Sequence, residues 1–522
     1  MAQTTAAGQA TQDGTRPKER PRRTPRREIW RPIDRQDFGF DEARHLLWRA
    51  GFGATPDQIS AIERLGPQRA VDYLLSADEI PYEDPRADLF DPNIIRPYTQ
   101  EEQRMAALAR RQRDEDTLAR LRAMRQQAQR EDRRQIRGVQ RWWLERMIET
   151  PRPLEEKMTL FWHGHFATSY RTIENSYHMY LQNQRFRRHA LGSYADLMFE
   201  IIRDPAMLAY LDNNDSRKGQ PNENLARELM ELFSLGVGNY TERDIKEGAR
   251  ALTGYTFRDD EFYFDRGNHD EGPKSILGAR GGLDGDGFVN AILSRDATAE
   301  FMTRKLYRYF VADLPESNRD DPREAAEALR NMRSVFRRSK YEIKPLLREL
   351  FLSNHFYSDA VRGEHIKSPA ELVVGGVREL RTPVRDLSVL LDAMELMGQN
   401  LLFPPSVAGW AGGRAWINTS TMFIRQNTLA FLLTGRKPGG ADALADRQVY
   451  DPGPILGQLA EALGAGDEAH TVRSVLRYAL GRVPGHAREP LAGALRSARG
   501  SSSEAMRDML LLVTAMPEYQ LC

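Results

Sequence analysis

Residues 157–169 read KMTLFWHGHFATS and place two histidines, His163 and His165, among aromatic side chains. The apolar residues before the histidines recur every three or four positions, which predicts a helix that ends near Gly164. In a continuous helix, residues two positions apart point about 160° from each other, whereas in an extended chain they share a face. The pair therefore either binds one metal ion together or points into two different environments.

A second stretch, PNENLARELMELFSLGVGNY at 221–240, follows about fifty residues later. Its periodicity predicts a helix over 222–235, with leucines on one side and Glu228 and Glu231 in a narrow polar sector on the other. Gly236 is a natural stop for this helix. The two stretches are interpreted as the two halves of one site.

Composition excludes several classes of protein. The chain has 522 residues, of which 40% are hydrophobic, so a globular protein of about two to four domains is expected. Lys and Arg number 75 and Asp and Glu 74, which gives no strong nucleic-acid signal. The single cysteine, Cys522, excludes a disulfide and leaves the ten histidines to supply any nitrogen or sulfur ligation.

No run of apolar residues is long enough for a membrane span. The first 28 residues contain arginine pairs but no apolar segment of a signal peptide, so a cytoplasmic location is expected.

Helical periodicity with glycine and proline stops predicts a mainly α protein. It has a multihelical globular body, a small β-hairpin near 255–265 and a charged projecting helix or helical hairpin. The predicted segments are a disordered basic tail at 1–34, an N-terminal helical segment at 35–99, the charged arm at 100–138, a central helical body at 139–435, a linker at 436–454 and a C-terminal helical segment at 455–522.

Imidazole suits zinc, iron or copper, and carboxylates can complete a metal site or move protons. The candidate metal ligands for a divalent ion are His163, His165 and His269. The candidate catalytic residues are Glu228, Glu231 and Asp270. The candidate substrate-binding residues are Asn222, Asn224, Arg227, Lys274 and Trp410. The alternative is structural: histidines bonded in an aromatic core, and glutamates on a solvated face paired with Arg227.

Several stretches together resemble one family. They are LLWRAGFGATP, EEKMTLFWHGHFATS, PNENLARELMELFSLGVGNYTERDIKEGARALTGY, GNHDEGPKSILG, IKSPAELVVG and PPSVAGWAGGRAWINTS. From about residue 40 to the end, the chain resembles the bacterial proteins catalogued as domain of unknown function 1800. The resemblance implies no activity, substrate or cofactor.

The resemblance implies that many relatives are exported and that an alkaline-phosphatase-like protein is a partner by association. This chain departs from the family at Arg295-Asp296, where relatives often have His-Pro. Two functions remain open. One is an enzyme with a polar, metal-binding site, expected to be a metal-dependent hydrolase. The other is a non-catalytic binding or assembly protein in which the same residues form a structural network and the arm meets the partner.

Overall fold

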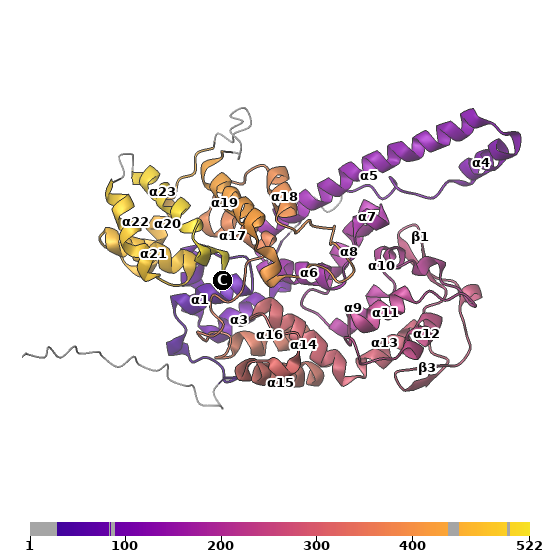
Figure 1. Ribbon diagram of the computed structural model, residues 1–522, viewed down its shortest axis with the longest axis horizontal. Helices are drawn as coiled ribbons and strands as arrows, with labels where there is room; N and C mark the ends of the chain where they lie inside the picture. Colours follow the sequence, from indigo (N-terminus) through magenta and orange to yellow (C-terminus); the bar gives the residue numbers. More distant parts are fainter. Residues whose placement is uncertain (1–28, 83, 85–88, 437–447, 498–501) are drawn as a thin grey trace, which may run out of the picture.

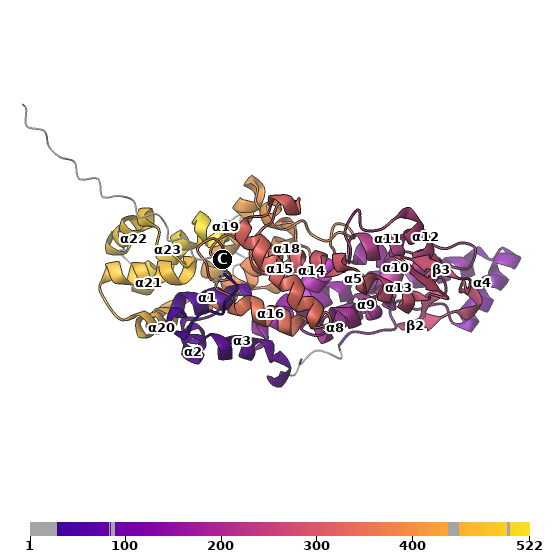
Figure 2. The same ribbon diagram turned by 90° about the horizontal axis from the view of Figure 1, so that it is seen from below.

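The computed structural model describes residues 29–82, 84, 89–436, 448–497 and 502–522. The chain is mainly α-helical, as predicted, with two small antiparallel hairpins. Figures 1 and 2 show a helical body from which one long arm projects. The predicted segment boundaries remain predictions, since most of the basic tail and much of the predicted linker lie outside the described residues.

The two ends of the described chain pack together. The N-terminal helices are α1 (Phe40–Arg49), α2 (Pro56–Leu65) and α3 (Pro67–Leu75). The C-terminal helices are α20 (Gly453–Leu463), α21 (Glu468–Leu480), α22 (Gly485–Ser497) and α23 (Ser502–Thr514). Helix α2 packs on α20 and α1 on α21 (Figure 2). A capping box begins α2, because Thr55 and Gln58 exchange side-chain and backbone hydrogen bonds.

The arm is a helical hairpin of α4 (Gln100–Gln112) and α5 (Glu115–Glu149), the hairpin option of the prediction (Figure 1). The break falls at Arg113, whose φ of 55° reverses the chain direction. Asp114 then caps α5 by accepting a hydrogen bond from the Thr117 N–H at 3.0 Å. The second half of α5 enters the body, where its apolar face is buried.

The central body surrounds α6 (Pro153–His165). Its first helices are α7 (Tyr170–Ile173), α8 (Ser176–Arg188), α9 (Tyr194–Ile201), α10 (Pro205–Tyr210), α11 (Asn224–Glu231) and α12 (Glu242–Ala251). The later helices are α13 (Gly285–Leu293), α14 (Asp296–Phe310), α15 (Arg323–Arg338), α16 (Ile343–Leu352), α17 (Pro369–Leu380), α18 (Leu387–Leu396) and α19 (Thr419–Thr434).

The predicted hairpin is confirmed as β1 (Tyr255–Arg258) and β2 (Glu261–Phe264). A second hairpin, β3 (Lys274–Ile276) with β4 (Ala279–Gly281), was not predicted from the sequence. This stretch is short and polar, so its pattern resembles a loop. Its β3 strand is nevertheless held against α12, where Glu247 accepts the Ser275 N–H at 3.1 Å.

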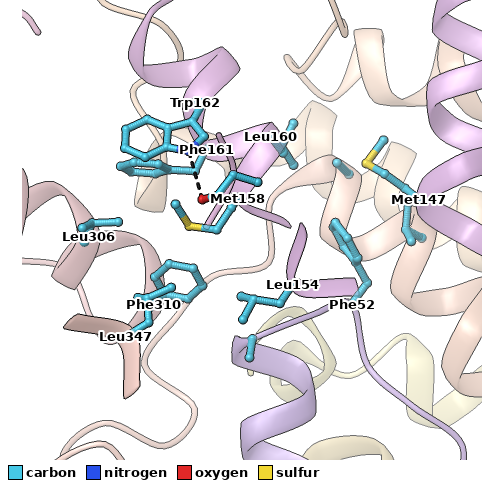
Figure 3. Packing of buried hydrophobic residues seen from close by; sticks show 14 of the residues in the cluster. Phe52, Met147, Leu154, Met158, Leu160, Phe161, Trp162, Leu306, Phe310 and Leu347 are labelled. Carbon is cyan, nitrogen blue, oxygen red and sulfur yellow. Dashed lines mark hydrogen bonds between the residues drawn. The ribbon is translucent and has the colours of Figure 1, made fainter. Parts of the chain in front are cut away.

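Helix α6 lies at the centre of the hydrophobic core. Figure 3 shows Met158 and Trp162 of α6 beside Leu306 and Phe310 of α14. These side chains are almost fully buried, and burial of each such apolar side chain stabilises the fold by about 1.5–3 kcal/mol. The core therefore fixes α6 and α14 against each other, and this packing positions the site described next.

Candidate functional site

His163 and His165 both belong to α6. Because residues two positions apart in a helix do not share a face, the two rings point in different directions. The His163 Nε2 accepts the Leu402 N–H at 3.2 Å, and the ring packs between Trp143 and Trp410. Burial lowers the pKa of His163 to about 3, so this imidazole is neutral at physiological pH. His163 thus holds the 401–416 loop in place.

His165 points towards the end of α11. Its Nε2 lies 3.0 Å from the Phe233 carbonyl oxygen, an acceptor, so Nε2 carries the proton and Nδ1 presents a lone pair. Burial, together with the charge of Lys305, holds the pKa of His165 well below its usual value. His165 is therefore a neutral imidazole of defined tautomer.

The C-terminal end of α11 differs from the prediction of a helix over 222–235. The helix runs only from Asn224 to Glu231, and the chain then unwinds. Its last turn is wide, because the Leu235 N–H donates to the Met230 oxygen. Unwinding releases the Leu232 and Phe233 carbonyls from the helix, and tertiary donors take them up instead.

Lys305 of α14 completes this arrangement. Its Nζ donates to His165 Nδ1 at 3.2 Å and to the Leu232 oxygen at 3.1 Å. Burial and the nearby Arg308 lower the pKa of Lys305 from 10.5 to about 8. An sp³ nitrogen with two such bonds keeps one further position, which carries a proton in the ammonium form and a lone pair in the neutral amine.

Lys305 lines a cavity of about 300 Å³ between α6, α14, the start of α17 and the 401–416 loop. Its titratable lining residues are His165, Lys305, Arg308, Asp313, His365 and Glu371. Its aromatic lining residues are Phe161, Tyr309, Trp410 and Trp416. An apolar wall with a few convergent polar groups is typical of small-molecule sites. A larger cavity of about 780 Å³ lies between α2, α3 and α17, but its described lining contains neither lysine nor histidine.

The 401–416 loop forms the lid-like wall of the smaller cavity. Gly409 has a φ of +77°, and a Cβ atom there would lie 2.1 Å from the Gly164 oxygen. At position 164 a Cβ atom would meet the Trp410 ring at an ordinary contact distance of 3.6 Å. Glycine at position 409 thus allows the loop to lie directly on the end of α6.

A buried ion pair forms the opposite wall. Glu371 of α17 accepts hydrogen bonds from Lys157 of α6 and, at 3.1 Å, from His365 Nε2. Burial opposes ionisation of Glu371, but Lys157 and His365 outweigh it and hold its pKa well below the usual value. Burial lowers the pKa of His365, so a neutral ring donates to the carboxylate.

The predicted residues of 222–231 form a separate surface cluster. Arg227 binds Glu223 at 3.1 Å and Glu242 at 3.0 Å, and Glu231 accepts the Tyr240 hydroxyl at 2.5 Å. Burial and the charge of Glu231 raise the pKa of Glu228. Asn222 donates to the Asp212 oxygen at 3.1 Å and accepts the Asn224 N–H at 2.9 Å, as in a local turn. None of these residues lines the cavity that contains Lys305.

The predicted residues of 269–274 form a third group. Asp270 accepts two hydrogen bonds from Arg250, at 2.8 and 3.1 Å, and this partner lowers its pKa to about 2. The His269 Nδ1 lies 2.8 Å from the Thr253 oxygen. Lys274 is buried on β3 and donates to the Gly272 oxygen at 3.2 Å. The predicted ligands His163, His165 and His269 are therefore not brought together.

The donor set does not fit a shared metal ion. Within the described ranges, no three His, Cys, Asp or Glu side chains lie close enough to hold one. The only free lone pair of the His165 ring faces the Lys305 amine, whose positive charge opposes a dication there. No chemical step is therefore assigned to a metal.

Sequence patterns single out His165 and Trp410 of the cavity but miss Lys305, Arg308, His365 and Glu371. One local signal was available, the capping box that Ser368 forms with Glu371 at the start of α17. This signal does not indicate which residues meet in space.

The fold and cavity define a mainly α-helical protein in which a half-buried lysine contacts a buried histidine at a ligand-sized site. The chain belongs to the family described as a protein of unknown function (DUF1800), whose model matches residues 45–521. Comparison with curated proteins found no match, and neither did comparison with solved structures. Over the described part of the chain, none of the helices is both long and apolar enough to cross a bilayer.

Proposed function

We propose that the chain is an enzyme that transfers protons on a small anionic ligand in the cavity, with Lys305 as the general acid–base. One observation supports this proposal: Lys305 Nζ donates to two acceptors, His165 Nδ1 and the Leu232 oxygen, and Lys305 also lines the cavity. With a pKa of about 8, roughly one tenth of the amine is neutral at pH 7. Such an amine suits proton transfer near neutral pH.

Two cations favour an anionic ligand. Among the described residues, neither Lys305 nor Arg308 forms an ion pair, although both line the cavity. The aromatic wall would hold the apolar part of the ligand, and Arg308 would bind its negative group. Hydrolysis, the reaction expected from the sequence, would use the Lys305 amine instead of a metal to take a proton from water.

The proposal is tested by the reactivity of Lys305. The full chain is treated at pH 7 with pyridoxal 5′-phosphate and borohydride, and the modified lysines are identified by mass spectrometry. We expect Lys305 to react at least tenfold faster than the surface Lys344, which binds Asp78 at 2.9 Å. Equal reactivity of the two lysines would contradict a lowered pKa and an accessible amine.

The arm supports a second candidate function, assembly with a partner. Its exposed apolar side chains are Met105, Leu108 and Met124, with exposed fractions of 41%, 54% and 54%. Apolar groups on a projecting hairpin are typical of interaction sites. The alkaline-phosphatase-like protein implied by the family resemblance is the first partner to test, by pull-down with the parent chain and a Leu108→Glu variant. Equal retention by both would argue against this surface.

A further inference from the structure

The cavity is not closed at Lys305. A second cavity of about 460 Å³ also contains Lys305 and Arg308 in its lining, so the two cavities meet at these cations. A third, of about 160 Å³, shares Glu300, Arg304 and Asn318 with the second. The three together follow one helix, α14.

The floor of this groove is one face of α14. At 100° per residue, Ala297, Phe301, Arg304, Lys305 and Arg308 fall within about 100° of one another. Leu306 and Phe310 lie on the opposite, core-facing side (Figure 3). From Ala297 to Arg308 the helix rises about 16 Å, which exceeds one sugar ring or one amino acid. The shape therefore suits a chain of linked units.

Charge along the groove is not uniform. Lys305 and Arg308 occupy the junction, whereas Asp313 lines only the first cavity and Glu316 only the second. Glu300 and Arg304 are already compensated, by Arg333 at 3.1 Å and by Asp321 at 2.5 Å. A ligand that fits this pattern has a negative group at the junction and hydroxyls on either side, because carboxylates accept hydrogen bonds from hydroxyls.

We propose that the groove along α14 binds an acidic oligosaccharide of at least two units, with a carboxylate at Lys305 and Arg308. This inference rests on the proposed function and names its substrate class. Trp410 and Tyr309 provide aromatic faces for one ring, and Phe301 and Val237 provide apolar contacts for the next. A densely charged acidic peptide fits less well, because Asp313 and Glu316 would repel its flanking charges.

The test is calorimetric titration of the full chain with galacturonate oligomers of one to six units. Neutral maltooligosaccharides and glutamate oligomers of equal length are the comparison series. We expect affinity to rise at least tenfold from one to three acidic units, with little gain in the other two series. Equal gain for glutamate oligomers would assign the groove to acidic peptides, and no gain with length in any series would overturn the inference.

A matched pair of variants locates the second unit. Val237 is 79% exposed and lines the second cavity, so Val237→Trp fills that cavity with little risk to folding. Val384 is 48% exposed and lines none of these cavities, so Val384→Trp is the control. Val237→Trp should abolish the gain from one to three units, whereas Val384→Trp should keep it. Equal loss or equal retention in both variants would contradict the placement.

The two proposals fail in distinguishable ways. If acidic oligomers bind but Lys305 is no more reactive than Lys344, the groove stands and the acid–base role is wrong. If Lys305 is reactive and a single galacturonate unit protects it as well as a trimer, the acid–base role stands and the extended groove is wrong.

Discussion

Lys305 Nζ lies 3.2 Å from His165 Nδ1, although the two residues are 140 positions apart in the chain. The neutral imidazole accepts one hydrogen bond from the lysine and the Leu232 carbonyl accepts another, so the amine is held in one orientation. Each partner comes from a different element: α6, the unwound end of α11, and α14.

The reactivity of Lys305 should rise with pH through about 8. The folded-state pKa lies below the ordinary 10.5, so the neutral amine increases as pH rises from 7 to 9. Labelling rates measured between pH 6 and 10 should show an inflection near 8 for Lys305. A labelling rate for Lys305 that is still rising steeply at pH 10 would contradict the lowered pKa.

Gly409→Ala should damage the site far more than Gly412→Ala. Both glycines have positive φ, +77° and +74°, so each substitution strains the backbone by about 1 kcal/mol. Only at position 409 would the new Cβ atom overlap the Gly164 oxygen, whereas position 412 is open. We expect Gly409→Ala to lower the free energy of unfolding by a further 1–3 kcal/mol or so. Denaturant titration of the two variants makes the comparison, and equal losses would disprove the close contact.

Glu371→Gln should destabilise the fold by about 3–5 kcal/mol, because it leaves the Lys157 charge buried without its partner. The folded-state pKa of Glu371 is below its unfolded value of about 4.5, so its contribution is complete above that pH. The contribution is lost as pH falls from 4.5 through the folded-state pKa. In that window the variant should therefore show a shallower loss of stability than the parent chain. Parallel curves would indicate that Glu371 is not ionised in the folded protein.

Asp132→Asn should loosen the base of the arm. This buried carboxylate accepts the Tyr170 hydroxyl at 2.7 Å and the Ser176 N–H at 3.0 Å. In asparagine an NH₂ group replaces one of the two carboxylate oxygens, so a donor would face the Tyr170 or Ser176 donor. We expect a loss of about 2–4 kcal/mol in unfolding free energy. Glu131→Gln changes the neighbouring exposed carboxylate and should cost less than about 0.5 kcal/mol. Similar melting temperatures for both variants would contradict a structural role for Asp132.

Glu228→Gln should leave Lys305 labelling unchanged, because Glu228 lies outside the cavity. Burial and Glu231 raise the folded-state pKa of Glu228, so its ionised form destabilises the fold above the ordinary pKa. The variant should consequently be slightly more stable at pH 7 than the parent chain. If Glu228→Gln abolished turnover of a substrate that binds in the cavity, that result would support the catalytic role predicted for Glu228.

Much of the fold follows from short-range pattern. Helical periodicity predicts the mainly α body, and alternating aromatic and polar residues predict the β1–β2 hairpin. Each of these depends on residues a few positions apart, whose hydrogen bonds and apolar spacing are visible in the chain itself. His163 and His165 are also visible in the sequence, because aromatic residues lie next to them in the chain.

The composition of the site depends on contacts across long stretches of chain. Periodicity predicts that α11 continues to 235, but Lys305, His165 and Tyr194 take up its last carbonyls and the helix ends at Glu231. A histidine pair two positions apart can face one ion or two environments, and only the packing of α6 against α14 and the 401–416 loop selects the second. No local pattern marks Lys305, since its role comes from burial and from two hydrogen-bond acceptors, His165 and Leu232, that lie far away in the sequence. Sequence thus specifies the helices, whereas the packing of α6, α11 and α14 specifies which side chains form the cavity.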